Sequence, residues 1–251
     1  MLPKLPSETV GEIYKDLFQP ALRQFGEAGE SVAKTVCLLS LPFVYAGGRY
    51  DQLLARVKKS FEKVPQDDLT KPPINAVFQI AEKLISMPAD DAISKMYIEL
   101  LSSCINKKWV SSVHPAFVNL ISQLSGDEAR FIDFLAQRER TIYLRRDNSW
   151  VTPTQTEIDN VLIPWYGSIL DGKPINESVF YPHILDVPEY FYTYLEHLHS
   201  LGIIEYVHGP EYLLNKEFIN SIKGYGHWYI SLSKFGRLFY NVCIKNSGAN
   251  D

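Results

Sequence analysis

The 251-residue chain is 46% hydrophobic and 22% charged, a composition typical of a globular protein with a sizeable core rather than of a disordered or fibrous chain. Its net charge of −4 is uneven. Residues 1–124 hold 14 Lys and Arg against 13 Asp and Glu, a balance of +1, whereas residues 125–251 hold 11 against 16, a balance of −5. An acidic second half disfavours a general nucleic-acid surface there, because phosphate contacts require cations.

Cysteine spacing and hydropathy indicate the compartment. The three cysteines, Cys37, Cys104 and Cys243, are far apart and form no C-x-x-C pair, so we expect buried free thiols in a reducing cytoplasm. The most apolar run, Val36–Gly48, is interrupted by Pro42 and is shorter than the about 20 residues of a membrane-spanning helix. It predicts a buried helix and no transmembrane span.

Amphipathic spacing predicts that residues 1–124 form a helical bundle of five or six helices. A first helix follows Ser7 and ends near Pro20, and a second covers about Glu27–Tyr45. The others are a helix with Leu53, Leu54, Val57 and Phe61 inward, one after Pro72–Pro73, one after Asp90–Asp91, and a short one from His114–Pro115 to about Leu124.

The second half begins with a helix start signal. Ser125 with Glu128 three residues later forms a capping box, and we place the domain boundary just before it. A polar stretch around Arg145–Asn148 follows, and then a helix from about Glu157 to Leu170. Asp186 and Glu189 form a second capping box, with a helix that stops at Gly202.

A β-hairpin and a last helix complete the pattern. Ile203–Val207 is expected to pair with Trp228–Leu232, and Ser233 to cap a final helix, Lys234–Ile244. Helices, a hairpin and a last helix in this order are typical of a winged helix, although the loop Gly209–Gly226 is long for a wing. The predicted fold is therefore mainly α: a helical bundle over residues 1–124, a winged-helix-like domain over 125–245, and a disordered tail over 246–251.

The helix that would meet DNA in such a domain has no cations. Pro174–Asn215 contains no Lys or Arg but six acids. We therefore expect the outward face of this helix to contact protein; its residues are Glu189, Tyr190, Thr193, Glu196 and His197. Any nucleic-acid contact would have to use the basic residues of the wing and the last helix, which are Lys216, Lys223, Lys234 and Arg237.

No residue pattern predicts a catalytic residue, a cofactor or a metal. Four histidines gather late in the chain, but His197 and His199 are two apart on a helix and cannot share one metal ion. His183 and His208 match no common zinc spacing. His114 with Asn106, Lys107, Lys108 and Trp109 is interpreted as a polar patch at one end of the bundle rather than as an active site, because loops tend to be polar.

Two segments resemble the core signature of the abortive infection alpha family. They are Met96-Tyr-Ile-Glu-Leu-Leu-Ser-Ser-Cys-Ile-Asn106 and His114-Pro-Ala-Phe-Val-Asn-Leu-Ile-Ser-Gln-Leu-Ser-Gly-Asp-Glu-Ala129. Tyr14–Pro20, Leu201–Ile204 and Leu232–Gly236 resemble the opening and the tail of the family, with Ser233 where Thr is usual. The resemblance implies a bacterial protein linked to phage resistance, in which an infected cell arrests or dies, and it carries over no catalytic residue. We interpret His114, Pro115 and Phe117 as a domain-junction motif.

These observations favour a non-enzymatic component of phage defence that acts through protein contact. Two alternatives remain. A winged-helix DNA-binding regulator would form dimers that present Lys216, Lys223 and Arg237 together. A toxic effector would act on nucleic acid or on a membrane, the latter through Leu39 and Phe43.

Overall fold

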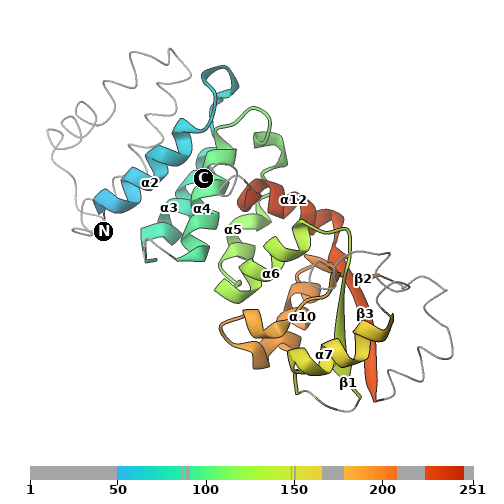
Figure 1. Cartoon of the computed structure of the whole chain (residues 1–251). Helices are drawn as coiled ribbons and strands as arrows, with labels where there is room; N and C mark the ends of the chain where they lie inside the picture. The colour runs from blue at the N-terminus through green and yellow to red at the C-terminus, as the bar shows by residue number, and fades with distance from the viewer. Residues whose placement is uncertain are drawn as a thin grey trace, which may run out of the picture. The chain divides into compact units, whose positions relative to one another are not determined.

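The chain is mainly helical, with a small antiparallel sheet (Figure 1). The computed structural model describes residues 50–85, 87–88, 91–147, 149, 151–165, 178–207 and 224–245. The two helices predicted before residue 46, the apolar run, most of the wing and the tail lie outside the described residues. The chain divides into two compact units, residues 1–124 with 241–251, and residues 125–240.

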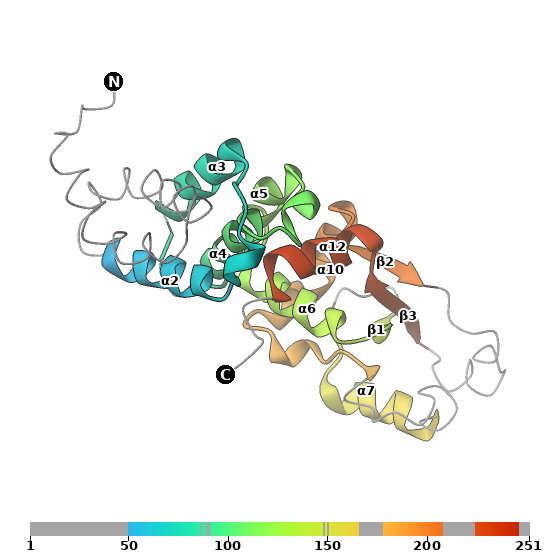
Figure 2. The same cartoon turned by 90° about the horizontal axis from the view of Figure 1, so that it is seen from above.

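In the described part of the first unit, three helices pack on α4 (Figure 2). Helix α4, Ala92–Cys104, is buried along almost its whole length, with Tyr97, Leu100 and Leu101 fully inaccessible. Its neighbours among the described residues are α2 (Tyr50–Glu62), α3 (Ile74–Ile85) and α5 (Ala116–Ile121). The described part of the unit also contains the short 3-10 turns η2 (Gln66–Asp68) and η3 (Val110–Ser112). The four helices predicted between residues 50 and 124 are present at these positions.

Polar side chains of α4 fix it to its neighbours. The Tyr97 hydroxyl donates to the carbonyl of Val118 at 2.9 Å, and Ser102 Oγ donates to the carbonyl of Ser60 in α2 at 3.3 Å. Ser103 Oγ donates to the carbonyl of Val242 at 2.7 Å. Val242 belongs to α12, Lys234–Cys243, whose last residues group with the first unit. Each of these polar groups is therefore paired inside the unit.

The second unit contains a three-stranded antiparallel sheet. Its strands are β1 (Thr141–Arg146), β2 (Ile204–Val207) and β3 (Tyr225–Leu232), in the order β1-β3-β2. Ile204 pairs with Leu232 and Tyr206 with Ile230, which confirms the predicted hairpin pairing. Strand β1 corrects the sequence-based interpretation of its last two residues, Arg145 and Arg146, as part of a polar stretch.

Helices cover both faces of this sheet. Ile142 and Leu144 of β1 pack with Ile158 and Leu162 of α7, Gln155–Leu162. On the other face, the Tyr143 ring lies edge-on to Phe191, with ring centroids 5.8 Å apart, at the start of α10, Phe191–Ser200. The described residues of this unit also form α6 (Gly126–Ala136) and the 3-10 turns η4 (Ile163–Trp165), η5 (Pro182–Ile184) and η6 (Pro188–Tyr190).

Two helix starts differ from prediction. No side chain caps η6 or α10, so the second capping box is wrong; the Asp186 carboxylate binds Arg130 at 2.8 Å instead. A capping box that the sequence analysis missed, Thr154 with Glu157, opens α7. Helix α7 ends at Leu162, before Pro164, because proline lacks the N–H that a helix interior requires.

The end of α10 and the start of α12 meet at one turn. Gly202 has a φ of +71°, and the amide of Ile203 donates to the carbonyl of Leu198 at 2.9 Å, as in a Schellman helix end. Ser233 Oγ caps α12 by accepting from the amide of Gly236 at 2.9 Å, as predicted. A Cβ on Gly236 would overlap the carbonyl oxygen of Ile203, so this contact requires glycine.

Candidate functional site

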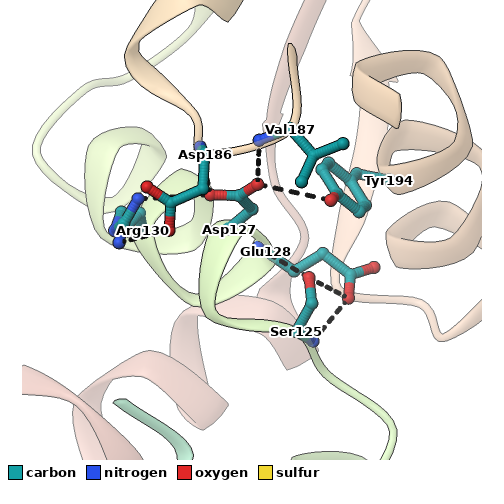
Figure 3. Close-up of polar contacts among 7 residues, drawn as sticks. All are labelled: Ser125, Asp127, Glu128, Arg130, Asp186, Val187 and Tyr194. Atoms are coloured by element: carbon teal, nitrogen blue, oxygen red, sulfur yellow. Dashed lines mark hydrogen bonds and ion pairs between the residues drawn. The ribbon is translucent and has the colours of Figure 1, made fainter. Parts of the chain in front are cut away.

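The Asp127 carboxylate, at the start of α6, is a densely connected polar group of the second unit (Figure 3). It is 4% exposed and accepts four hydrogen bonds. Oδ1 accepts from the backbone amide of Asp186 at 2.9 Å and from Arg130 at 3.2 Å; Oδ2 accepts from the amide of Val187 at 3.0 Å and from the Tyr194 hydroxyl at 3.3 Å. Asp127 therefore joins α6 to the segment that leads into α10.

The neighbouring carboxylate, Glu128, makes a second connection. Its Oε2 accepts from the amide of Ser125 at 2.7 Å and from Ser125 Oγ at 3.0 Å, which confirms the first capping box (Figure 3). Its Oε1 lies 2.6 Å from Nδ1 of His197, on α10. One glutamate thus both caps α6 and holds α10.

The geometry of these two carboxylates indicates a structural role rather than acid–base catalysis. Asp127 and Glu128 are almost completely buried, and their oxygens are occupied by partners within the unit. A general acid or base must reach a substrate proton within hydrogen-bond distance. With their oxygens held in this way, we assign these two carboxylates the role of positioning α10.

The predicted contact face lies on η6 and α10. Glu189, Thr193 and Glu196 are exposed, and Tyr190 is 56% exposed, with its ring edge-on to Tyr194 at 6.3 Å. The side chain of His197 is 34% exposed, with its ring bound to Glu128. The structure therefore places four of the five residues at the surface and the fifth between the surface and α6.

Two of the four predicted nucleic-acid contacts can be placed. Lys234 is exposed at the first position of α12. Arg237 is exposed too, but its guanidinium donates to the carbonyls of Ala136 and Arg138 at 3.2 and 3.4 Å, beside the carboxyl-terminal end of α6. A cation in this position binds free carbonyls and opposes the helix dipole. Lys216 and Lys223 lie outside the described residues.

The His114 motif begins α5. His114 Nδ1 accepts the amide of Ala116 at 3.1 Å, and its ring lies 5.8 Å from that of Phe117, which is fully buried. Pro115 is exposed at the N-cap of the helix. The adjoining polar patch is bound to η2, since Lys108 Nζ pairs with Asp68 at 2.6 Å. Both features have a structural explanation.

The late histidines do not converge. His183 is exposed, and the His199 ring lies tilted against the Tyr206 ring, with centroids 4.8 Å apart. His208 lies outside the described residues. Across the part of the chain that the structure describes, no three His, Cys, Asp or Glu side chains are grouped so as to hold a metal ion.

Comparison with protein families identifies the family of this chain. A family model described as abortive infection alpha matches residues 49–243. The chain belongs to the abortive infection alpha family. Membership supports a role in abortive infection, a form of phage defence. Comparison with curated proteins and with solved structures finds no match.

The segments that carry the family resemblance coincide with the connections described above. The first includes Tyr97 and Ser103, which bind α5 and α12. The second includes Asp127 and Glu128, and the tail segments meet where Gly236 contacts Ile203. The contacts of these residues within the fold therefore give the family motifs a structural explanation in this chain. Among the helices described, none combines the length and apolar character needed to cross a membrane.

The sequence does not predict two connections of the second unit. They are the hydrogen bonds of the Asp127 carboxylate and the ion pair of Arg146 with Glu157. The role of Asp127 cannot be read from the sequence, because three of its four partners, Asp186, Val187 and Tyr194, are about 60 residues further along the chain. The Thr154–Glu157 spacing is a usable signal, since it is the same capping pattern as Ser125–Glu128.

Proposed function

We propose that this protein is a non-enzymatic component of abortive infection that acts in the bacterial cytoplasm by binding another protein. The proposed contact surface is the exposed acidic face formed by Glu189 and Tyr190 of η6 with Thr193 and Glu196 of α10, called the α10 face below. The observation that carries the proposal is the composition of this face, which has acids and an exposed tyrosine but no cation. Tyrosine is enriched in protein interfaces.

We infer further that the second unit is a winged-helix-like domain. In support, α6, α7 and α10 precede the β2–β3 hairpin, and α12 follows it. The pairing of β1 with β3 adds a third strand to the hairpin. In this interpretation α10 is the helix that a DNA-binding relative would place in the major groove.

Electrostatics favours protein over DNA as the partner of α10. Non-specific DNA affinity comes from cations that neutralise phosphates and release counterions. Glu189 and Glu196 would instead approach phosphates as like charges. Arg237, one of the four candidate nucleic-acid contacts, donates to two backbone carbonyls of its own unit. A partner surface rich in Lys and Arg complements the α10 face.

The decisive experiment measures phage protection. Cells that express the protein are challenged with a panel of phages, and at least one phage should plate with lower efficiency than on cells with an empty vector. The double variant Glu189→Lys/Glu196→Lys should lose about 10-fold or more of this protection while keeping its thermal unfolding midpoint, because reversed charges repel a basic partner.

The matched control is Glu205→Lys, which reverses an exposed acid on β2 outside the α10 face. It should protect like the wild type. Equal protection by the double variant and the wild type would overturn the proposed contact surface.

A binding measurement separates the DNA alternative. Fluorescence anisotropy with a labelled duplex should show no binding at about 50 mM salt, where electrostatic affinity is strong. Binding that falls steeply toward about 200 mM salt, and that disappears in Lys234→Gln/Arg237→Gln, would replace the proposal with a DNA-binding regulator.

A further inference from the structure

A pocket of about 380 Å³ opens in the second unit among residues of α6, α7, η4 and η5. Its apolar walls are formed by Val179, Ile163, Ile184 and Phe134. Ile163 and Ile184 are 55% and 49% exposed, unusual values for large aliphatic side chains. The pocket is within the size range of small-ligand sites and has an apolar rim.

Its polar groups are acceptors. Asp159 Oδ1 accepts the Tyr181 hydroxyl at 2.6 Å, and Asp159 Oδ2 accepts no hydrogen bond from the described residues. The Gln155 amide and the His183 ring also line the pocket, and within the described part of the chain neither has a hydrogen-bond partner. The pocket thus combines one carboxylate with two further groups that can accept a hydrogen bond.

The charge of the lining is negative. Asp159 is the acid among the lining residues, and none of the described lining residues is Lys or Arg. The nearby guanidinium of Arg138 is held on the Phe134 ring, 3.6 Å from its centroid, and donates to the Phe134 carbonyl. A cationic group with an apolar stem is complementary to this arrangement.

The pocket adjoins the α10 face. His183 and Ile184 belong to η5, which contacts η6, and η6 carries Glu189 and Tyr190. One partner could therefore cover both the acidic face and the pocket.

We propose that this pocket receives an arginine side chain of the protein partner; the proposal rests on the proposed function and specifies the partner's chemistry. The planar guanidinium has five donors in a fork that suits spread acceptors such as Asp159 Oδ2 and Gln155 Oε1. The rings of Tyr181 and His183 add aromatic surface, on which guanidinium groups stack. The aliphatic stem of the arginine packs between Ile163 and Ile184.

The pocket is tested on the full chain with two small probes of nearly equal shape, N-butylguanidinium and its neutral isostere N-butylurea. Chemical-shift titration should give N-butylguanidinium at least about 10-fold higher affinity, as expected for a charge-assisted contact. Asp159→Asn should abolish this preference. Equal affinity of the two probes, or a preference that survives Asp159→Asn, would overturn the proposal.

Two variants control for folding and location. Tyr181→Phe leaves the Asp159 carboxylate in place and should keep the preference for N-butylguanidinium; a loss of the preference there would count against direct contact with Asp159. Glu205→Gln removes an acid outside the pocket and should change neither affinity.

Phage protection separates this proposal from the broader one. Asp159→Asn should reduce protection. If the probes fail to discriminate while Glu189→Lys/Glu196→Lys still loses protection, the pocket proposal fails and the proposed function stands. If the probes discriminate while both variants protect like the wild type, the cation site stands, and its assignment to the partner fails with the proposed function.

Discussion

Asp127 Oδ2 accepts the backbone amide of Val187 at 3.0 Å, across 60 positions of sequence. The same carboxylate accepts the amide of Asp186 and the Tyr194 hydroxyl, so a single buried side chain fixes the entry to α10. The orientation of the α10 face consequently depends on a residue that does not belong to it.

Replacing Asp127 by its isostere asparagine should destabilise the second unit. The new carboxamide would direct its N–H groups at donors that now meet a carboxylate, and a buried unsatisfied donor costs about 1–3 kcal/mol. Urea unfolding followed by circular dichroism measures the change. The control, Asp186→Asn, weakens an exposed ion pair with Arg130 and should cost clearly less, because surface ion pairs contribute little to stability. Equal losses would contradict this role.

Gly236→Ala should destabilise the protein by about 3 kcal/mol or more, at or beyond the upper end of overpacking costs. The new Cβ would meet the Ile203 backbone at a distance that requires the chain to move. Gly126→Ala is the matched control, because its Cβ would have no neighbour within 4 Å. It should cost no more than about 0.5 kcal/mol. Similar thermal midpoints for the two variants would refute the close contact.

Glu157 should make stability depend on pH in the acid range. Hydrogen bonds from Thr154 and Arg146 lower the pKa of Glu157 from 4.5 to about 2. Because the folded-state pKa is depressed, this stabilisation is present above about pH 4.5 and is lost as the pH falls toward 2. Urea midpoints measured across this range should fall less steeply in Glu157→Gln than in the wild type. Glu205→Gln should follow the wild-type slope; identical slopes for all three would contradict the prediction.

The two described cysteines should resist alkylation in the native protein. Burial raises the pKa of the Cys104 thiol to about 12, and it raises the pKa of Cys243 well above its ordinary value. At about pH 8 both side chains are therefore held as thiols, and the thiolate is the reactive form. Peptide mapping after iodoacetamide treatment should show both modified in urea and neither under native conditions. Rapid native labelling of either cysteine would refute this.

Features set by neighbours in sequence were predictable. The Ser125 capping box, the Gly202 stop and the Ser233 cap each depend on chemistry within about four residues. The hairpin was predictable for the same reason, since alternating apolar residues identify a half-buried strand. Helical spacing also indicated which residues of α10 would be exposed.

Features set by distant partners were not predictable. Arg145 and Arg146 make their segment look polar in the sequence. In the structure, Arg145 lies over the Tyr192 ring and Arg146 pairs with Glu157, so both side chains have partners within β1's surroundings. Asp186 has the spacing of a cap, yet Arg130 binds its carboxylate and Asp127 binds its amide. The pocket was missed because its lining comes from four separate elements.

The end of α12 has a consequence for the order in which the molecule is completed. Val242 accepts Ser103 Oγ, and Cys243 is fully buried, so the last turn of the helix supplies part of the interior of the first unit. During synthesis, residues 1–124 leave the ribosome long before this turn does. The first unit therefore reaches its final packing only after the whole second unit has been synthesised, and a chain truncated before Asn241 would leave the Ser103 hydroxyl without its acceptor.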